Sequence, residues 1–221
     1  MTRDLFTAEL RQLQDEVLVL GSMAEKAIMD SLEALRDGDQ AWSHKIIADD
    51  LKINRKRFEI EDRTIFVVAS QQPMAADLRA LASILYIITD LERIADHAEG
   101  ISRINLMLGD EPLPRRLGYI PAMSDRALAM LRNSLKAYIE QDVESARRIC
   151  DADDEVDHLQ DSVYDDCIKG MIADPSTIQR NTYLLWTAHN LERIADRCTN
   201  ICERVIYLVT GTMEEINVSK Y

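Results

Sequence analysis

Pairs of acidic residues one helical turn apart are the side chains in this sequence whose types and spacing could do chemistry. Glu92 and Asp96 belong to the hexapeptide Leu-Glu-Arg-Ile-Ala-Asp, and the same hexapeptide returns with Glu192 and Asp196. Side chains at positions i and i+4 lie on one stripe of a helix, where like charges repel each other. Such a pair therefore favours a compensating cation, which can be an arginine or a metal ion.

More oxygen ligands precede each hexapeptide. Asp153 and Asp157 repeat the i, i+4 spacing before the second copy, and Asp50 with Asn54 takes that place before the first. If the helices carrying these residues are antiparallel neighbours, about four oxygen-bearing side chains meet in each half. That number suits Mg²⁺, Mn²⁺ or a multinuclear iron or zinc cluster, without choosing among them.

Arginine is the simpler explanation for the paired acids. Arg93 and Arg193 lie inside the two hexapeptides, and Arg79 lies a few turns earlier. Exposed helix flanks often carry mixed charge of this kind, and such pairs contribute little to stability. Both explanations remain open at this point.

Long helices must position these acids, because glycine and proline are rare and apolar residues recur at helical spacing. The pattern predicts an all-α fold with six long helices. Their expected ranges are 1–37, 40–70, 74–108, 121–139, 143–172 and 176–210.

The hexapeptide indicates an internal duplication, since Leu85 and Ile101 also match Leu185 and Ile201 at the same offset. We therefore expect two tandem three-helix bundles, residues 1–110 and 120–221, joined by a linker at residues 111–119. The linker lies in the Gly- and Pro-rich stretch GDEPLPRRLG. On a helical wheel, the Leu, Ile and Ala of each hexapeptide face the core, while Glu and Asp lie at the border of the apolar arc.

Composition excludes several classes of protein. The formal net charge of −13 argues against a nucleic-acid-binding protein, which needs a basic face. No apolar run is long enough to span a membrane, so we expect no membrane insertion. Four cysteines without a secretory leader favour a reducing cytoplasm.

An enzyme is not expected, and no catalytic residue is predicted. The sequence has no Gly-rich phosphate loop and no nucleophile motif. Glu155 and His158 form one Glu-x-x-His pair, but a di-iron bundle needs two such pairs. Cys198 and Cys202 fall inside the apolar arc and are predicted to be buried packing residues.

The whole chain resembles the PhoU family of phosphate-signalling regulators. The resemblance is carried by QQPMAADLRAL before the first hexapeptide, by DLERIADHAEGI, and by NLERIADRCTNI in the second half. It implies a cytoplasmic, non-enzymatic, commonly dimeric protein built from two three-helix bundles. It also implies an adaptor between the ATP-binding subunit of the phosphate ABC transporter and a phosphate-responsive sensor histidine kinase, which holds the phosphate-starvation response down when phosphate is plentiful.

The resemblance further implies metal ions bound through (Glu/Asp)-x-x-x-Asp motifs. In the first repeat these fall on Asp50 with Asn54 and on Glu92 with Asp96; in the second they fall on Asp153 with Asp157 and on Glu192 with Asp196. The metal is a divalent or transition ion: iron, zinc, nickel, manganese or magnesium. Because Asn54 brings no charge, we expect the second-repeat site to be the stronger one.

Two other functions compete with the adaptor. A carboxylate-bridged metal-handling bundle, either a di-metal oxidase or a storage protein, would turn over iron with oxygen or hold many ions per chain. A purely structural helical scaffold would bind no metal, and replacing Asp157 or Glu192 in it would not change partner binding.

Overall fold

The computed structural model describes residues 3–109 and 118–216, and within these ranges the chain is helical with no β-strand. The α-helical fold predicted from the sequence is confirmed. The helices are α1 (Arg3–Asp37), α2 (Gln40–Gln71), α3 (Ala75–Leu108), α4 (Ile120–Glu140), α5 (Val143–Asp151), α6 (Asp153–Ala173) and α7 (Ile178–Thr210), with a 3₁₀ turn at Pro175–Thr177.

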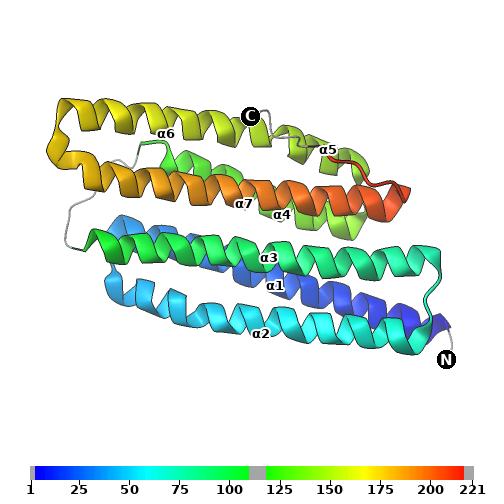
Figure 1. Cartoon of the computed structure of the whole chain (residues 1–221). Helices are drawn as coiled ribbons and strands as arrows, with labels where there is room; N and C mark the ends of the chain where they lie inside the picture. The colour runs from blue at the N-terminus through cyan, green and yellow to red at the C-terminus, as the bar shows by residue number, and fades with distance from the viewer. Residues whose placement is uncertain (1–2, 110–117, 217–221) are drawn as a thin grey trace.

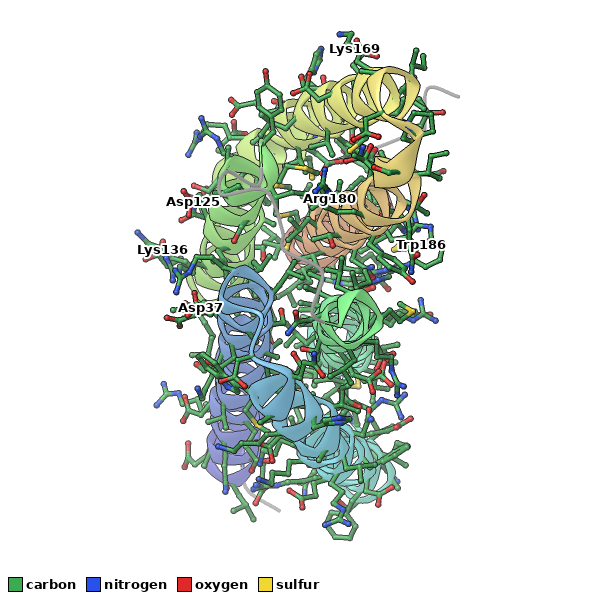
Figure 2. All side chains as sticks on the ribbon, turned by 90° about the vertical axis from the view of Figure 1, so that its left-hand side faces the viewer. Asp37, Asp125, Lys136, Lys169, Arg180 and Trp186 are labelled. Atoms are coloured by element: carbon green, nitrogen blue, oxygen red, sulfur yellow. The ribbon has the colours of Figure 1, made fainter. Side chains whose placement is uncertain are left out.

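The helices form two three-helix bundles stacked side by side (Figure 1). α1, α2 and α3 make the first, and α4, α5 with α6, and α7 make the second. The two bundles meet through α3 against α7 and α1 against α4. α2 and α6 therefore lie at opposite edges of the molecule (Figure 2).

The core confirms the apolar half of the hexapeptide. Leu91, Ile94, Leu191 and Ile194 are fully buried, as are the alanines that follow each isoleucine. The burial of Cys198 and Cys202, predicted from the wheel, is also confirmed. These side chains fix the rotation of α3 and α7, so the glutamate and aspartate of each hexapeptide must point to the sides.

Capping residues set where the helices begin and end. Asp39 caps α2 by accepting a hydrogen bond from the Trp42 backbone N–H at 2.8 Å, directly after Gly38 turns the chain with φ of 67°. Gln72 closes the same helix in the left-handed region, and Pro73 separates it from α3. The turn between the helices is therefore short, and α2 runs antiparallel to both α1 and α3 (Figure 1).

The prediction of one continuous helix over 143–172 is wrong, because the structure breaks it into α5 and α6 at Ala152. The break falls in Asp-Ala-Asp-Asp-Glu, where three acids occupy the first turn of α6. Acids are stabilising at a helix N-terminus, and aspartate is a weak former of helix interiors, so a restart here suits Asp153 and Asp154 better than continuation. It also buries Asp153 at the start of α6.

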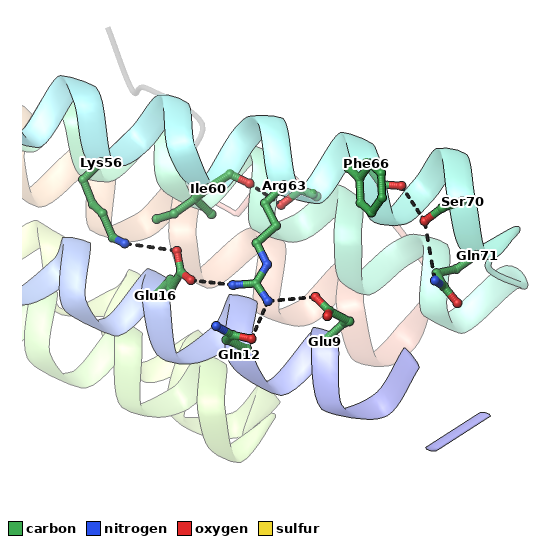
Figure 3. Close-up of polar contacts among 10 residues, drawn as sticks. Glu9, Gln12, Glu16, Lys56, Ile60, Arg63, Phe66, Ser70 and Gln71 are labelled. Atoms are coloured by element: carbon green, nitrogen blue, oxygen red, sulfur yellow. Dashed lines mark hydrogen bonds and ion pairs between the residues drawn. The ribbon is translucent and has the colours of Figure 1, made fainter. Parts of the chain in front are cut away.

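Ion pairs fasten α2 to α1 (Figure 3). Arg63 donates to Glu16 at 2.7 Å and to Glu9 at 2.8 Å, and also to Gln12. Lys56 reaches Glu16 at 3.0 Å. These contacts commit one flank of α2 to the bundle, while its apolar residues pack on the core.

Polar residues at the α3–α7 contact repeat with the duplication. Asp90 accepts from Asn200 at 3.2 Å and lies 3.6 Å from Arg197. At the corresponding positions with the helices exchanged, Asn190 contacts His97 at 3.0 Å. The two bundles are thus related by an approximate twofold axis, with a charged pair on one side of it and a neutral pair on the other.

No helix in the described ranges is long and apolar enough to cross a membrane. Most of the predicted linker, residues 111–119, lies outside the described residues. The proposed division into 1–110 and 120–221 stays a prediction.

Candidate functional site

The second-repeat acids lie on two neighbouring helices, α6 and α7. Asp153 and Asp157 come from the first two turns of α6, and Glu192 and Asp196 come from the middle of α7. The charges of Asp153 and Asp157 act on Glu192, and that of Asp196 acts on Asp157. The two stripes therefore face each other, as antiparallel packing predicted.

Burial and repulsion between neighbouring acids make Glu192 and Asp157 costly to ionise. The pKa of Glu192 is raised to about 7, first by burial and then by the charge of Asp196, with Arg193 opposing the shift. Burial also raises the pKa of Asp157, with further contributions from Asp196, Asp154 and Asp161. At neutral pH the cluster carries negative charge that is only partly compensated.

Arginine provides part of the compensation. Arg193 lies 2.6 Å from Asp196 and 3.7 Å from Glu192, and His189 lies 3.4 Å from the other oxygen of Glu192. The arginine explanation therefore applies to Asp196. It does not cover Glu192, whose pKa stays raised in spite of the neighbouring guanidinium.

The first repeat forms a matching cluster between α2 and α3. The pKa values of Asp50 and Asp96 are both raised to about 6, primarily by burial. The next cause is Asp96 for Asp50, and Glu92 for Asp96. Glu92 thus takes part through its neighbour on α3 and is not among the residues whose charge acts on Asp50.

Glu99 is a member of the first cluster that the motif did not include. Its charge raises the pKa of both Asp50 and Asp96, and its side chain pairs with Arg103 at 2.6 Å. The signal was present in the sequence, because Glu92, Asp96 and Glu99 follow one helical stripe. With Glu99 the first cluster also has four carboxylates, and the additional negative charge offsets the absence of charge at Asn54.

Asn54 acts as a hydrogen-bond donor. Its Nδ2 donates to Oδ2 of Asp50 at 2.7 Å, while Oδ1 of Asp50 is buried and accepts no hydrogen bond. Oε2 of Glu192 is likewise buried without a hydrogen bond, although His189 is within ion-pair distance. Buried carboxylate oxygens without hydrogen-bond donors are costly, and each cluster contains such an oxygen.

A hard cation fits this need. The available metal ligands are all oxygens, as Mg²⁺ and Mn²⁺ prefer, and two of these oxygens are buried without a hydrogen-bond partner. Over residues 3–109 and 118–216, however, no three His, Cys, Asp or Glu side chains already converge on one point. The side chains would therefore have to draw together around an ion.

A pocket of about 170 Å³ adjoins the first cluster, between α1, α2 and α3. Ala27, Trp42 and Ile46 contribute to its apolar lining, and Asp50 and Glu99 also line it. One side of the first cluster is therefore open to a small group. The sequence did not predict this pocket, because its walls come from three helices.

The Glu-x-x-His pair is directed elsewhere. Glu155 forms an ion pair with Arg126 of α4 at 3.1 Å, and His158 is exposed and contacts the backbone carbonyl of Asp154. The two side chains are thus committed to separate local partners, in agreement with the solvated or locally paired His158 that the sequence favours.

Comparison with known proteins gives an independent view of both repeats. The PhoU domain model matches residues 17–104 and again residues 120–205. The phosphate-specific transport system accessory protein PhoU homolog of Clostridium acetobutylicum is 38% identical over 218 residues, covering 98% of this chain and 100% of that protein. The Escherichia coli protein PhoU, with the same accessory description, is 31% identical and covers 93% of this chain and 86% of its own.

Solved structures agree with the fold. The crystal structure of PhoU from Pseudomonas aeruginosa superposes with a TM-score of 0.87 at 32% identity, covering 94% of this chain and all of that one. The phosphate transport system regulatory protein PhoU from Streptococcus pneumoniae gives 0.88 at 31% identity, with 95% and 99% coverage. With both repeats matched in sequence and nearly the whole chain matched in structure, this protein belongs to the PhoU family.

Proposed function

We propose that this protein is a cytoplasmic, non-enzymatic adaptor that represses phosphate-starvation signalling when phosphate is plentiful. The observation that carries the proposal is the full-length match to relatives named as phosphate-specific transport system accessory proteins. The partners implied by the PhoU resemblance are the ATP-binding subunit of the phosphate ABC transporter and a phosphate-responsive sensor histidine kinase.

The two acidic clusters supply the adaptor with cation sites. Asp153, Asp157, Glu192 and Asp196 would hold one divalent or transition metal ion or cluster, and Asp50, Glu92 and Asp96, with Glu99, would hold another. A bound cation would neutralise the facing carboxylates and lower the cost of their burial. Because these residues come from α6 and α7 in one cluster, and from α2 and α3 in the other, a bound cation would hold the outer helix of each bundle to its neighbour.

Metal handling as the main function is the second candidate, and the positions of Glu155 and His158 argue against it. A di-iron oxidase places its Glu-x-x-His pairs inside the bundle. Here Glu155 pairs with Arg126 and His158 is exposed. We therefore expect no oxygen-dependent turnover of iron by the purified protein.

Deletion of the gene tests the regulatory role. Alkaline phosphatase is measured in cells grown in high phosphate, with and without a plasmid-borne copy. We expect the deletion to release the enzyme's synthesis and the plasmid to restore repression. Unchanged repression in the deletion strain would contradict the proposal.

A pull-down tests the partners separately. The tagged protein is recovered from cells grown in high phosphate, and the co-purifying proteins are probed for the kinase and for the transporter ATPase. We expect at least one of them to be retained, and retention of neither would refute the adaptor role. A tagged variant carrying Asp157→Asn and Glu192→Gln shows whether the second cluster contributes to retention, which a purely structural scaffold would not predict.

A further inference from the structure

α2 presents an apolar face that no described part of the chain covers. Leu51, Phe58 and Ile65 follow one another at seven-residue spacing with exposed fractions of 61%, 57% and 52%, and the adjacent Phe66 is 67% exposed. α2 lies at the edge of the molecule with no helix beyond it (Figure 2). Its core-facing residues lie on the opposite side of the helix: Ile53, Ile60, Thr64 and Val67.

The second repeat differs from the first along part of this face. Aligning Asp50 and Asn54 with Asp153 and Asp157 matches Leu51 with Asp154 and Phe58 with Asp161. The corresponding stripe of α6 is therefore acidic at these positions. Ile65 aligns with Ile168, which is 36% exposed, so the two repeats differ at the Leu51 and Phe58 positions and not along the whole stripe.

Two charged residues lie within the stripe, and neither is neutralised inside the chain. Arg55 and Asp62 form no ion pair or hydrogen bond with any described residue. They are seven residues apart, about 10 Å along the helix, and so cannot pair with each other. One positive and one negative group are thus both available to a partner.

The order of residues along the stripe is self-complementary. A twofold axis that crosses α2 between Phe58 and Glu59 would place Arg55 opposite Asp62 of the partner subunit, and Asp62 opposite the partner's Arg55. The same axis sets Leu51 against the partner's Phe66 and brings the two copies of Phe58 together at the centre. The exposed Ala48 and Ala69 also match, so small residues oppose each other at the ends.

We propose that the α2 face (Ala48, Leu51, Arg55, Phe58, Asp62, Ile65, Phe66 and Ala69) is a twofold interface with a second copy of this chain, with the two α2 helices antiparallel. Isologous contacts of this kind require a self-complementary surface, and aromatic residues at the centre of such a contact contribute most of its affinity. The PhoU resemblance implied a dimer without naming a surface. The interface rests on the α2 residues and does not depend on the phosphate-related function.

Charge reversal with rescue tests both the face and the register. The oligomeric state of the full chain is measured by analytical ultracentrifugation at about 0.15 M salt, where screening limits the repulsion between two chains of net charge −13. We expect Arg55→Asp and Asp62→Arg each to raise the dimer dissociation constant at least about tenfold, because each places like charges opposite each other twice. The double variant Arg55→Asp with Asp62→Arg restores dimerisation.

Two further variants complete the experiment. Phe58→Asp removes the central contact and should give a monomer, while Ile172→Asp, which changes an even more exposed residue of α6, should leave the dimer intact. Helical circular dichroism and the melting temperature check that every variant is folded. A monomeric wild-type chain, a dimer indifferent to Phe58→Asp, or single charge reversals that the double variant does not rescue would each overturn the proposal.

Discussion

Glu192 shows most clearly the free-energy cost of burying ionised carboxylates in the acidic clusters. It is half-buried on α7, its Oε2 accepts no hydrogen bond, and its pKa is raised to about 7 by burial and by neighbouring acids. A carboxylate in this position is unfavourable for the folded protein unless a cation is present. Its presence in the fold therefore needs an explanation other than stability, and cation binding supplies one.

The first prediction concerns replacement of this residue. Glu192→Gln should raise the thermal stability of the metal-free protein at pH 8 by about 2–4 °C, on the order of 1 kcal/mol after allowance for the carboxylate's partial contact with water. At pH 5 the wild-type side chain is protonated in the folded state, and most of the difference should disappear. Thermal unfolding in a chelator at the two pH values measures the effect, with Glu140→Gln as a matched exposed control.

The sign follows from linkage between folding and protonation. Glu192, Asp50 and Asp96 have raised pKa values in the folded state, so the folded chain binds protons more tightly than the unfolded chain. Their contribution to stability is fully present below the unfolded values near 4 and is lost as pH rises to about 7. A melting temperature for Glu192→Gln below that of the wild type at pH 8 would show that the carboxylate is already compensated.

The i, i+4 spacing predicted which acids face each other, and Leu, Ile and Ala predicted which side of each helix is buried. Glu99 was not predicted as a member of the first cluster, because it lies outside the repeated hexapeptide. Its proximity to Asp50 depends on how α2 packs against α3. Arg193 lies closer to Asp196, at 2.6 Å, than to Glu192, at 3.7 Å, and this preference depends on side-chain conformation, which spacing does not determine.

At the scale of the elements, α3 and α7 position both clusters, because each supplies an acidic stripe to one side and packs on the other helix. Asp90 lies at their contact and is buried beside Arg197 and Asn200. Burial raises the pKa of Asp90 in spite of these partners. The ion pair is therefore a weak source of stability, but an unpartnered Arg197 would be worse.

The second prediction follows from that asymmetry. Asp90→Ala should destabilise the protein by about 2–3 kcal/mol, because it leaves the Arg197 guanidinium without its counter-charge. Replacing both residues, with Asp90→Leu and Arg197→Met, should recover most of the loss, since two apolar side chains need no partner there. Chemical denaturation of both variants measures this. Equal destabilisation by the single and double variants would show that packing, and not the unpaired charge, is responsible.

The sequence also predicted the helices themselves with their approximate ends, since Gly38, Pro73 and Pro175 mark them clearly. It did not predict the break at Ala152, because apolar periodicity continues across it. The break follows from the acids that crowd the start of α6, whose preference for a helix N-terminus outweighs continuation. Asp153 is buried only because of this restart.

At the scale of the whole molecule, the two bundles share one interface in α3 against α7 and α1 against α4. Neither bundle can separate without exposing that contact, so the chain should unfold as a unit in spite of its duplication. Each repeat carries one tryptophan: Trp42 on α2 in the first and Trp186 on α7 in the second, where Figure 2 shows it pointing away from the other helices.

The third prediction uses these two probes. Unfolding by urea is followed by fluorescence in Trp42→Phe and Trp186→Phe, which report on the second and the first repeat, respectively. In each variant, the urea midpoint measured by fluorescence should equal the midpoint measured by circular dichroism on the same variant. A fluorescence transition clearly earlier than the loss of helix in one variant would mean that the repeats unfold independently.

Titration calorimetry of the metal-free protein with Mn²⁺ measures whether the facing carboxylates of each bundle bind a cation. We expect saturable binding that strengthens as pH rises from 5 to 8, because protons leave the clusters. One class of sites should be lost in Asp157→Asn with Glu192→Gln, and the other in Asp50→Asn with Asp96→Asn. Binding with unchanged stoichiometry and affinity in both double variants, or no binding by the wild-type protein, would contradict cation binding by these carboxylates.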